Sequence, residues 1–274
     1  MDLWLITVNF VNTKLTKQLI DSLTSIDSSN SLKIGIADNA SSSKSVEKLN
    51  QIKNNSGLDI SIFFYKQNYY YWPAAKKVFT KMRKKYKKLP DWILICNNDV
   101  TFPDKNFLKK LKEINSKKYP IIGPDIIGSN GNKLNPFMLS TLSWVEKCFW
   151  WMYFKSYTLS LILLKIKSLR TLFLNKPKKH NQSFFQKVYA IHGSAILFSG
   201  EYFNRGGWLD DNFEMFGEEM SVAEIAKSLK MPVTYYPNVE IIHHEHSITK
   251  NTDKKLLYKK AKESYKYIKS TYLK

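Results

Sequence analysis

The sequence is poor in cysteine and in acidic residues, and it contains no long apolar run. Its two cysteines, Cys96 and Cys148, form no CxxC pair, so nothing indicates a disulfide framework or a cysteine metal site. The N-terminus shows no charged start followed by an apolar segment, as a secretory leader would. The most apolar stretch, residues 157–164, is followed by Lys165 and Lys167 and is shorter than the roughly 20 residues of a membrane-spanning helix. We therefore expect a cytoplasmic protein without a transmembrane helix.

The shortage of acids leaves the chain strongly basic. There are 43 Lys and Arg against 23 Asp and Glu, which gives a formal net charge of +20. Such a charge describes binding partners more than fold, and it fits nucleic acid, an anionic membrane surface or phosphorylated substrates. The 274 residues are 43% hydrophobic and contain no internal repeat and no Pro/Gly/Ser-rich linker, so we expect a single domain over 1–274.

Strand-like and helix-like segments alternate over the first 130 residues. Apolar runs typical of buried strands are followed by apolar residues at helical spacing. The expected strands are 3–8, 32–37, 59–65, 92–96 and 119–127, with helices around 15–26, 46–52, from 73 onward and 107–114. This alternation predicts an α/β fold with a mostly parallel central sheet flanked by helices. Later, strand character returns at 188–199 and 232–243, on either side of a helix near 220–229.

Polar residues follow the expected strands of the first half directly. Asn9, Asp38, Asn68 and the run Asn97-Asn98-Asp99 each come after an apolar strand. Ligands of open α/β sheets bind beyond the carboxyl ends of the strands. One such residue alone is as often a helix cap or a turn residue. Four of them together predict a polar site at this edge of the sheet.

Asp99 ends the apolar strand that contains Ile93. A carboxylate there can hold Mg²⁺ or Mn²⁺ on a diphosphate, because these ions take their remaining ligands from phosphate and water. The bound ion would serve as a Lewis acid for the leaving group. Helix capping is the alternative role, since many strands end in Asp.

Two further clusters could contribute to such a site. Glu218 and Glu219 stand at the start of a predicted helix, where they either cap its N-terminus or supply one buried carboxylate with a raised pKa as a general base. His243 and His244 end the last strand, and strand alternation places them on opposite faces. One of them could complete the ligands of a metal, or it could be a hydrogen-bonded structural histidine.

Together these residues resemble the bacterial sugar transferases of glycosyltransferase family two, which have the glycosyltransferase A fold and include rhamnosyltransferases. The resemblance covers most of the chain, and the order and spacing of its segments are more specific than any one segment. The matching segments are Asp38-Asn39-Ala40-Ser41, Asn68, Asn97-Asn98-Asp99-Val100, His192-Gly193-Ser194-Ala195, Gly206-Gly207-Trp208-Leu209-Asp210 with Glu218-Glu219, and His243-His244 with Ser247.

The resemblance implies an inverting, metal-dependent transferase. The donor would be a nucleotide-diphosphate sugar, UDP- or dTDP-linked, and the acceptor a cell-surface polysaccharide such as capsule or lipopolysaccharide, or a lipid-linked glycan. Residues 1–130 would form the donor half, 131–250 the acceptor half and 251–274 a C-terminal basic helix. The implied residues are Asn9, Asp38, Asn68, Asn98 and Asp99 for the donor, Asp99, His243 and His244 for the metal, His192, Gly193 and Trp208 for the acceptor, and Glu219 or Glu218 as the base.

Several positions depart from the family pattern. Tyr70 and Ala74 replace glycines of the donor loop, which makes this loop bulkier. Asn98 leaves a single acid in the metal motif. Glu219 replaces the usual Asp, so the choice of base between it and Glu218 stays open.

A basic, aromatic segment runs from Trp144 to Lys179. Between Lys147 and Lys179 it carries eight Lys or Arg and no acid, mixed with Trp, Tyr and Phe. It could form a helical insertion that lies on an anionic membrane, which would make the protein peripheral on the inner face, or an amphipathic helix packed on the core. The helix expected over 251–274 is also rich in lysine and could add to this attraction.

Two other functions fit parts of the sequence. Interleaved Lys and Tyr would suit a nucleic-acid-binding protein, but no binding motif is present and the polar residues gather at strand ends. Nucleic acid is therefore the less favoured partner. A nucleotidyltransferase acting on sugar phosphates would share the nucleotide and metal sites, but residues 9–16 contain none of the glycines of a phosphate-binding loop.

Overall fold

The computed structural model describes residues 1–26, 31–174, 184–245 and 253–273, with the backbone alone described for 169–174. Ser247 of the family pattern and the last three lysines of the basic segment, at 176, 178 and 179, lie outside these ranges. Among the described residues, no helix has both the length and the apolar character needed to cross a membrane.

The first half alternates strands and helices as the sequence predicts. Its elements are β1 (Leu3–Asn9), α1 (Thr13–Thr24), β2 (Leu32–Asn39), α2 (Ser43–Asn55), β3 (Asp59–Tyr65), α3 (Tyr71–Tyr86), β4 (Trp92–Asn97), β5 (Val100–Thr101), α4 (Phe107–Lys112) and β6 (Ile121–Gly128). Local chemistry sets the boundaries. The side chain of Ser42, for example, accepts a hydrogen bond from the backbone N–H of Ser45 and caps α2.

The second half adds a helical insertion and completes the sheet. Its elements are α5 (Trp144–Tyr153), α6 (Tyr157–Leu174), β7 (Gln186–Val188), β8 (Ala195–Ser199), α7 (Gly200–Asn204), α8 (Glu218–Ser228), β9 (Val233–His243) and α9 (Lys254–Tyr272). The strand expected over 188–199 is two strands, β7 and β8, separated by a turn at residues 192–194. That turn becomes part of the candidate site.

The nine strands form one sheet in the order β3-β2-β1-β4-β8-β6-β9-β5, with β7 paired to β9. The first four strands of this order are parallel, as are β6 and β9. Strand β8 runs antiparallel to both β4 and β6. The sheet is therefore parallel in the first half and mixed in the second, because the chain re-enters it after a long excursion through α5 and α6 instead of a short crossover.

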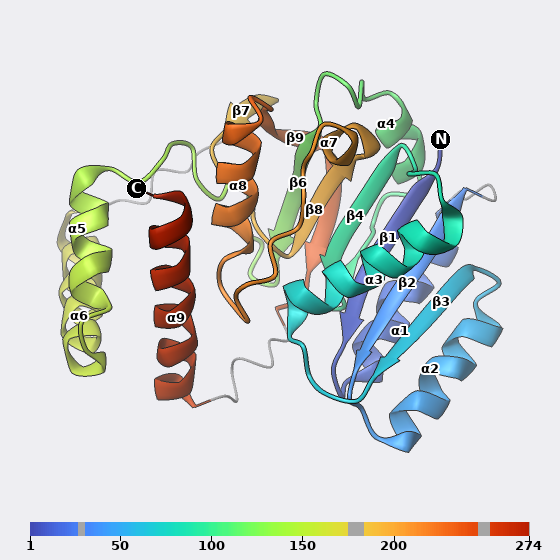
Figure 1. The fold of residues 1–274 in the computed structure, drawn as a ribbon, viewed down its shortest axis with the longest axis horizontal. Helices are drawn as coiled ribbons and strands as arrows, with labels where there is room; N and C mark the ends of the chain where they lie inside the picture. The colour runs from blue at the N-terminus through green and yellow to red at the C-terminus, as the bar shows by residue number, and fades with distance from the viewer. Residues whose placement is uncertain (27–30, 175–183, 246–252, 274) are drawn as a thin grey trace.

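Helices cover both faces of the sheet (Figure 1). Alternate side chains of β1 point to opposite faces, so Trp4 and Ile6 join a core beneath α3, α7 and α8, while Leu3 and Leu5 join a core with α1 and α4. Gly35 of β2 lets α3 approach closely, since a Cβ there would lie 2.5 Å from atoms of the α3 side chains. The result is a three-layer α/β domain.

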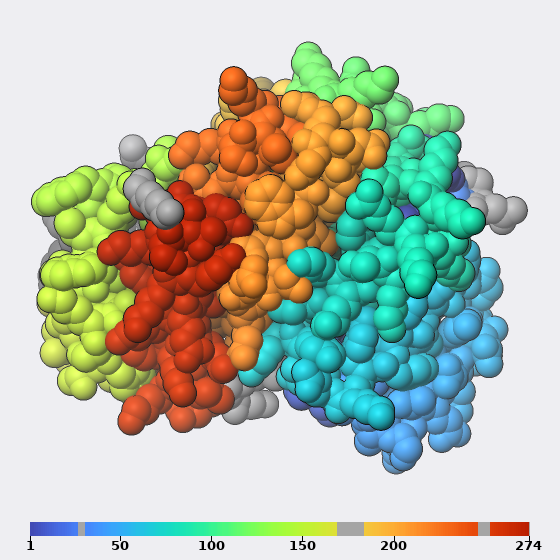
Figure 2. All heavy atoms as spheres, viewed as in Figure 1, coloured from blue at the N-terminus to red at the C-terminus, as the bar shows by residue number. Residues whose placement is uncertain are grey.

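Helices α5, α6 and α9 form a separate layer at one end of the molecule (Figure 1). The space-filling view shows the surface of α9 between the α5–α6 pair and the rest of the protein (Figure 2). Aromatic contacts join them: Phe154 stacks on Tyr265 with ring centroids 4.6 Å apart, and Tyr157 meets Tyr258 edge-on at 5.4 Å. None of the residues of α5 is fully buried.

The strand directions bring distant segments to one edge of the sheet. The carboxyl ends of β1, β2 and β4 lie together because these strands are parallel, and β9 ends at the same edge. Strand β8 runs the other way, so it starts at this edge, where Cys96 pairs with Ala195. The turn before β8 therefore faces the ends of β1, β2, β4 and β9.

Candidate active site

A buried polar network occupies the ends of β1 and β2. The Nδ2 of Asn9 donates to Asp38 Oδ1 at 2.8 Å, and Asn9 Oδ1 accepts from the Thr16 hydroxyl at 2.8 Å. The side chain of Asn98 donates to the same Thr16 oxygen at 3.0 Å. Asn9 and Asp38 are 0% and 1% exposed. Such burial fixes both side chains, so the network joins three of the predicted donor residues into one rigid unit.

Asp99 and His243 form the part of the site that fits a metal. His243 Nε2 lies 3.1 Å from Asp99 Oδ1, and the two side chains come from the β4–β5 turn and the end of β9. Both residues are buried, and among the described residues neither His243 Nδ1 nor Asp99 Oδ1, apart from the contact of Asp99 Oδ1 with His243, has a hydrogen-bond partner. Buried polar atoms without partners are costly, so a cation beside them would relieve that cost.

The protein supplies few ligands to such an ion. Among the described residues, no group of three or more His, Cys, Asp or Glu side chains is placed to hold a metal. Asp99 and His243 therefore fit a Mg²⁺ or Mn²⁺ ion that takes its other ligands from phosphate and water, as these ions commonly do.

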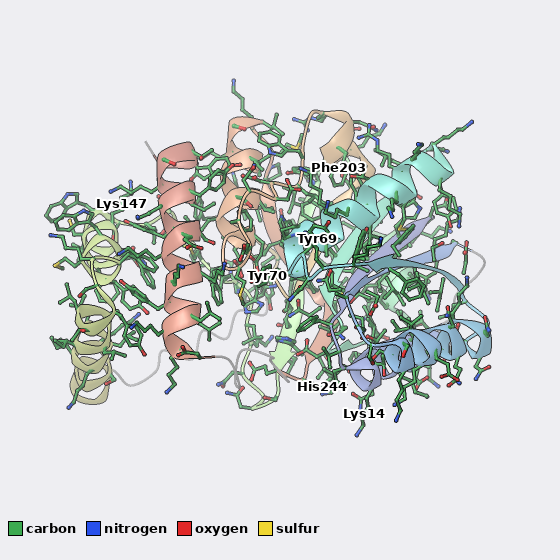
Figure 3. All side chains as sticks on the ribbon, turned by 60° about the horizontal axis from the view of Figure 1, so that its bottom comes forward. Lys14, Tyr69, Tyr70, Lys147, Phe203 and His244 are labelled. Atoms are coloured by element: carbon green, nitrogen blue, oxygen red, sulfur yellow. The ribbon has the colours of Figure 1, made fainter. Side chains whose placement is uncertain are left out.

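His244 does not join this pair, although the sequence offered both histidines as ligands. Its Nε2 lies 2.8 Å from the Thr101 hydroxyl, and its backbone N–H donates to the Asp99 carbonyl at 2.9 Å. Strand alternation explains the difference, because neighbouring side chains at the end of a strand point to opposite sides. His244 instead holds the turn that carries Asp99, and it lies with Lys14 along the lower edge of the view in Figure 3.

The two glutamates at the start of α8 meet the turn before β8. Glu219 Oε1 accepts a hydrogen bond from the Gly193 N–H at 3.1 Å, while Glu218 Oε2 accepts from the Gly217 N–H at 2.9 Å. A Cβ on Gly193 would lie 2.6 Å from Glu218 Cγ and 2.9 Å from Glu219 Oε1. Glycine is therefore required at 193 for both carboxyl groups to approach the turn.

The environment raises the pKa of both carboxyl groups. Burial comes first for Glu219, followed by the charge of Glu218, and together they raise its pKa to about 8. Burial also raises the pKa of Glu218. The hydroxyl of Tyr71 donates to the Gly193 carbonyl at 3.0 Å, and the pKa of Tyr71 is raised by burial and then by surrounding acids that include Glu218, Glu219 and Asp99. Tyr71 thus lies within electrostatic range of the two glutamates and of Asp99.

A series of hydrogen bonds, ring contacts and adjacent residues links the ends of β1 and β2 to the two glutamates. The network of Asn9 and Asp38 reaches Asn98, and the next residue, Asp99, meets His243. The rings of His243 and His192 have centroids 6.0 Å apart. The residue after His192 is Gly193, which donates to Glu219. Asp38, Asp99 and Glu219 therefore lie along one series of neighbouring residues at this edge of the sheet.

Asn68 lies outside this network. Its side chain is exposed and accepts a hydrogen bond from the Tyr70 N–H at 2.8 Å, which closes the turn before α3. Tyr70 has a φ of 59°, the left-handed conformation that glycine adopts most easily. The side chain of Asn39 donates to the Tyr70 carbonyl at 2.9 Å and holds this conformation. The loop thus keeps a glycine-like backbone with tyrosine in place of glycine, and Figure 3 shows Tyr69 and Tyr70 near the centre of the molecule.

The predicted acceptor residues His192 and Trp208 have different surroundings. His192 is close to the glutamates and packs edge-on against Phe137, with ring centroids 5.7 Å apart. Its Nδ1 lies 2.9 Å from the Ser194 hydroxyl, and burial lowers its pKa to about 4, so the imidazole is neutral. Trp208 is 44% exposed, and its carbonyl accepts from the Tyr202 hydroxyl at 2.8 Å. Its indole is therefore accessible.

Asp210 ties the C-terminal helix to the loop that precedes α8. It is 2% exposed, and its Oδ2 accepts hydrogen bonds from the hydroxyls of Tyr267 and Tyr272 at 2.9 and 2.6 Å. A second tie comes from Ser264 of α9, whose hydroxyl donates to the Met215 carbonyl at 2.5 Å. Helix α9 therefore supports the segment that carries the glutamates.

Comparisons with known proteins find solved structures with a similar fold. No protein-family model matches the sequence, and a sequence comparison with curated proteins finds no match. Solved structures do match: S. aureus TarS, with a TM-score of 0.55 and 12% identity over 89% of the chain, and GalNAc-T7 with UDP, GalNAc and Mn²⁺, with 0.58 and 11% over 89%. A third match is the mannosyltransferase PcManGT from Pyrobaculum calidifontis in complex with GDP-Man and Mn²⁺, with a TM-score of 0.54 and 10% identity over 98%.

The fold is glycosyltransferase A. This confirms the fold expected from the sequence, including the helix-flanked sheet. The chain spans 37% of the length of TarS, 44% of GalNAc-T7 and 70% of the mannosyltransferase. In this glycosyltransferase A fold, the candidate site occupies the edge of the sheet where the parallel strands end, as ligand sites of open α/β sheets do.

Sequence reasoning missed four residues of the site. Thr16 looks like an ordinary polar position of a helix, and Tyr71 like an aromatic residue at a helix start. Asn39 and Asp210 stand inside segments that match the family pattern, but nothing local distinguishes them from their neighbours. Their roles depend on partners at least seven and up to 122 residues away in the chain, so only the tertiary structure reveals them.

Proposed function

We propose that the protein is an inverting glycosyltransferase that takes a sugar from a nucleotide-diphosphate sugar and passes it to a glycan acceptor. The observation that carries this proposal is the meeting of a metal-type pair, Asp99 and His243, with a glutamate of raised pKa at one sheet edge. The fold supports it, since the solved neighbours include a mannosyltransferase with GDP-Man and Mn²⁺ and TarS in complex with UDP-GlcNAc.

The donor half of the site would bind the nucleotide and its diphosphate. The rigid Asn9–Asp38 unit presents a carboxylate to the base or ribose, and Asp99 with His243 would hold Mn²⁺ or Mg²⁺ against the diphosphate. When bound, the ion would neutralise negative charge on the departing nucleoside diphosphate. UDP and dTDP are the nucleotides we propose, from the family resemblance.

The acceptor half would supply the base. Glu219 receives a proton from the acceptor hydroxyl, whose oxygen attacks the anomeric carbon as the bond to the diphosphate breaks. A single displacement of this kind inverts the anomeric configuration. A pKa near the working pH suits a carboxylate to this role, because it must be free of its proton before it can take one. Glu218 would assist by holding the pKa of Glu219 high, and His192 and Trp208 would contact the acceptor.

The acceptor we propose is a cell-surface polysaccharide or a lipid-linked glycan. The net charge of +20 favours acceptors and surfaces that carry phosphate. The exposed apolar side chains of α5 and α6, which include Trp144 and Trp151, favour contact with lipid. Membrane association at the inner face would bring the enzyme to such acceptors.

A binding screen tests the donor proposal first. Thermal unfolding of the purified protein is measured with UDP, dTDP, GDP and ADP, each with and without Mn²⁺. We expect one nucleotide to raise the unfolding temperature in a Mn²⁺-dependent manner. Equal stabilisation by all nucleotides, or by DNA and RNA fragments of similar charge, would instead indicate general phosphate binding and contradict the proposal.

The stereochemistry of the product tests the mechanism. The nucleotide identified in the screen is supplied as its α-linked sugars, and the anomeric configuration of the product is read by NMR. An inverting enzyme gives a β-linked product. If the product is α-linked, the protein is still a glycosyltransferase, but Glu219 does not serve as the base of a single displacement.

A further inference from the structure

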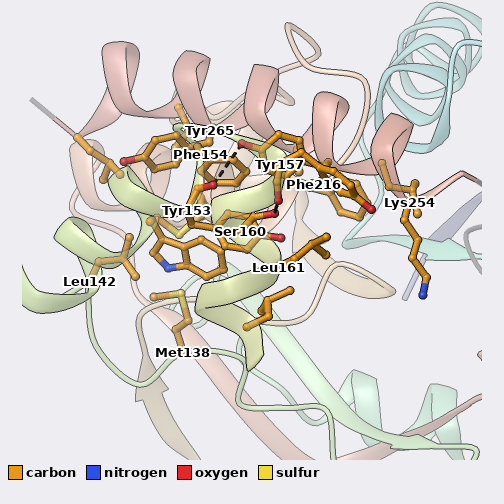
Figure 4. Close-up of a pocket in the computed structure, with 18 of the residues that line it drawn as sticks. Met138, Leu142, Tyr153, Phe154, Tyr157, Ser160, Leu161, Phe216, Lys254 and Tyr265 are labelled. Carbon is orange, nitrogen blue, oxygen red and sulfur yellow. Dashed lines mark hydrogen bonds between the residues drawn. The ribbon is translucent and has the colours of Figure 1, made fainter. Parts of the chain in front are cut away.

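An apolar cavity of about 540 Å³ lies between the α5–α6 pair and α9. It is within the roughly 300–1,000 Å³ of ligand-binding pockets. Aromatic residues line much of it, with Trp150, Tyr153 and Phe154 at the end of α5 and Tyr258 and Tyr265 on α9. The close-up labels Tyr153, Phe154 and Tyr265 (Figure 4).

Most of its wall is apolar, and two of the hydroxyls in it are already hydrogen-bonded. The Ser160 hydroxyl donates to the Tyr157 carbonyl at 2.6 Å, and the Tyr258 hydroxyl donates to the Tyr153 carbonyl at 3.2 Å. These hydroxyls need no partner from a ligand. The wall therefore favours a hydrocarbon over a sugar, because buried hydroxyl groups of a sugar would lose their hydrogen bonds to water.

The cavity lies directly beside the proposed base. Its wall includes Phe216 and Met220, which flank Glu218 and Glu219 in the sequence, and Phe137, whose ring packs against His192. Phe216 has a φ of 61° and is 47% exposed, a strained backbone for a bulky residue. Strain of this kind persists where a side chain is held for a function, and here it keeps an aromatic ring at the junction of cavity and active site.

Charge at the cavity identifies the rest of the ligand. Lys254 lines one end, and its ammonium group points away from the aromatic cluster (Figure 4). Exposed lysines at 147, 165, 255 and 259 lie on the same three helices, and another at 155 lies between α5 and α6. The outer surface of α6 is also apolar, with Ile166 56% exposed. An apolar cavity beneath an apolar, cationic surface matches a lipid with an anionic head.

We propose that this cavity binds the hydrocarbon chain of a lipid-phosphate acceptor and so presents the acceptor's hydroxyl to Glu219. The inference rests on the proposed function and narrows its acceptor to a glycan carried on an isoprenoid or acyl phosphate. Each CH₂ group that leaves water for the cavity favours binding, so even a partly inserted hydrocarbon chain would be held.

Binding of farnesyl phosphate tests the proposal directly. Its chain is short enough to be used as a dissolved monomer, and the titration follows heat release with the full-length protein. We expect saturable binding to one site, weaker binding of farnesol and no competition from inorganic phosphate at the same concentration. No saturable binding of farnesyl phosphate would overturn the proposal.

Two neighbouring residues of α6 supply matched variants. Leu161 lines the cavity, whereas Ile162 is exposed outside it. Leu161→Glu places a carboxylate in the cavity wall and should weaken binding by roughly tenfold or more, because the charged group replaces apolar surface that would contact the hydrocarbon chain. Ile162→Glu adds the same charge to the same helix and should leave the affinity unchanged. Equal loss in both variants would show that the lipid binds to the outer surface, which contradicts the proposal.

A variant that fills the cavity and a nucleotide titration distinguish failure of the lipid-binding proposal from failure of the proposed function. Ala261→Trp fills the cavity from α9 and should also block farnesyl phosphate, which keeps the test valid if Leu161→Glu fails to fold. UDP with Mn²⁺ is titrated into the same preparation of wild-type protein. If the protein binds the nucleotide but not the lipid, the proposal that the cavity binds lipid is overturned and the proposed function stands. If it binds the lipid but not the nucleotide, the proposed function is overturned, and with it the role of the lipid as acceptor.

Discussion

The two halves of the molecule position their residues of the candidate active site by different means. The first half uses parallel strands, whose ends place Asn9, Asp38 and Asp99 at one edge and lock them by hydrogen bonds within a buried network. The second half uses loops and helix starts. Gly193 and Glu219 come from a turn and from the first turn of α8, held in place by contacts with α9.

This difference has a physical consequence. Positions at strand ends are set by the sheet and tolerate little movement, which suits the binding of a donor of fixed shape. Positions in the second half depend on tyrosine hydroxyls and aromatic packing around an open cavity, which suits acceptors of varied length. The following changes test this division between a rigid donor side and an adaptable acceptor side.

Removal of the proposed base should have the largest effect. Glu219→Gln keeps the size of the side chain but cannot accept a proton, so kcat should fall by roughly 10²–10⁴-fold with donor affinity retained. Steady-state rates and nucleotide titrations measure the two effects separately. Glu240→Gln, an exposed position on β9, is the control. A larger fall in Glu218→Gln than in Glu219→Gln would exchange the roles of the two acids.

Substitution of the glycine between the halves should come next. In Gly193→Ala, the new Cβ would collide with both carboxyl groups, and a displacement of about 1 Å at a reacting group can cost roughly 10²-fold in rate. We expect lost transfer activity with unchanged nucleotide binding. Gly128→Ala, which meets the side chains of Glu245 and Asn130 at 3.1 and 3.4 Å, serves as the matched substitution. Weakened nucleotide binding in Gly193→Ala would place this turn on the donor side instead.

The rate should also depend on pH in a defined direction. Because the pKa of Glu219 is raised to about 8, most of the carboxyl is protonated at pH 6 and inactive as a base. The value of kcat/KM should therefore rise by more than roughly tenfold between pH 6 and pH 8 and then level off. Circular dichroism at each pH excludes unfolding as the cause. A rate already constant from pH 6 would contradict the assignment of this carboxylate as the base.

The two histidines at the end of β9 should differ in metal dependence. His243→Ala removes a proposed ligand and should weaken Mn²⁺-dependent nucleotide binding by roughly 10–100-fold. His244→Ala removes a side chain that contacts Thr101 on the other face of the strand and should change the Mn²⁺ dependence much less. Nucleotide titrations at several Mn²⁺ concentrations compare them. The reverse order would move the metal to the other face of the strand.

Loss of the α9 anchor should affect stability more than donor binding. Asp210→Ala removes the acceptor of two tyrosine hydroxyls and should lower the free energy of unfolding by roughly 2–3 kcal/mol. Its neighbour Asp211 pairs with Lys76 at the surface, so Asp211→Ala should cost at most about 1 kcal/mol. Urea unfolding measures both. Similar costs would mean that α9 is held by its apolar contacts alone.

Much of the first half could be predicted from its sequence. Buried parallel strands are continuous apolar runs. Their positions along the chain, the helices between them and the polar residues at their ends therefore follow from local pattern. The second half could be predicted less well. The split of 188–199 into two strands depends on the turn at Gly193, whose need for glycine arises from glutamates more than 20 residues later.

The proposed metal ligands Asp99 and His243 show the same limit of sequence-based prediction. Strand alternation predicts that His243 and His244 face opposite ways, but it cannot say which of them meets Asp99. That outcome is set by the pairing of β5 with β9, where Val100 lies opposite His243. The apolar cavity could not be predicted either, because it belongs to three helices that are distant in sequence and meet through aromatic rings.

Paramagnetic broadening by Mn²⁺ tests most directly whether the two halves form one site. Backbone amide signals of the ¹⁵N-labelled protein are recorded with UDP and either Mn²⁺ or diamagnetic Mg²⁺. If Asp99 and His243 hold the ion beside the base, the signals of Gly193 and Glu219 will broaden together with those of Asp99 and His243. Sharp signals for Gly193 and Glu219, with broadening at Asp99 alone or at scattered surface acids, would contradict the shared site.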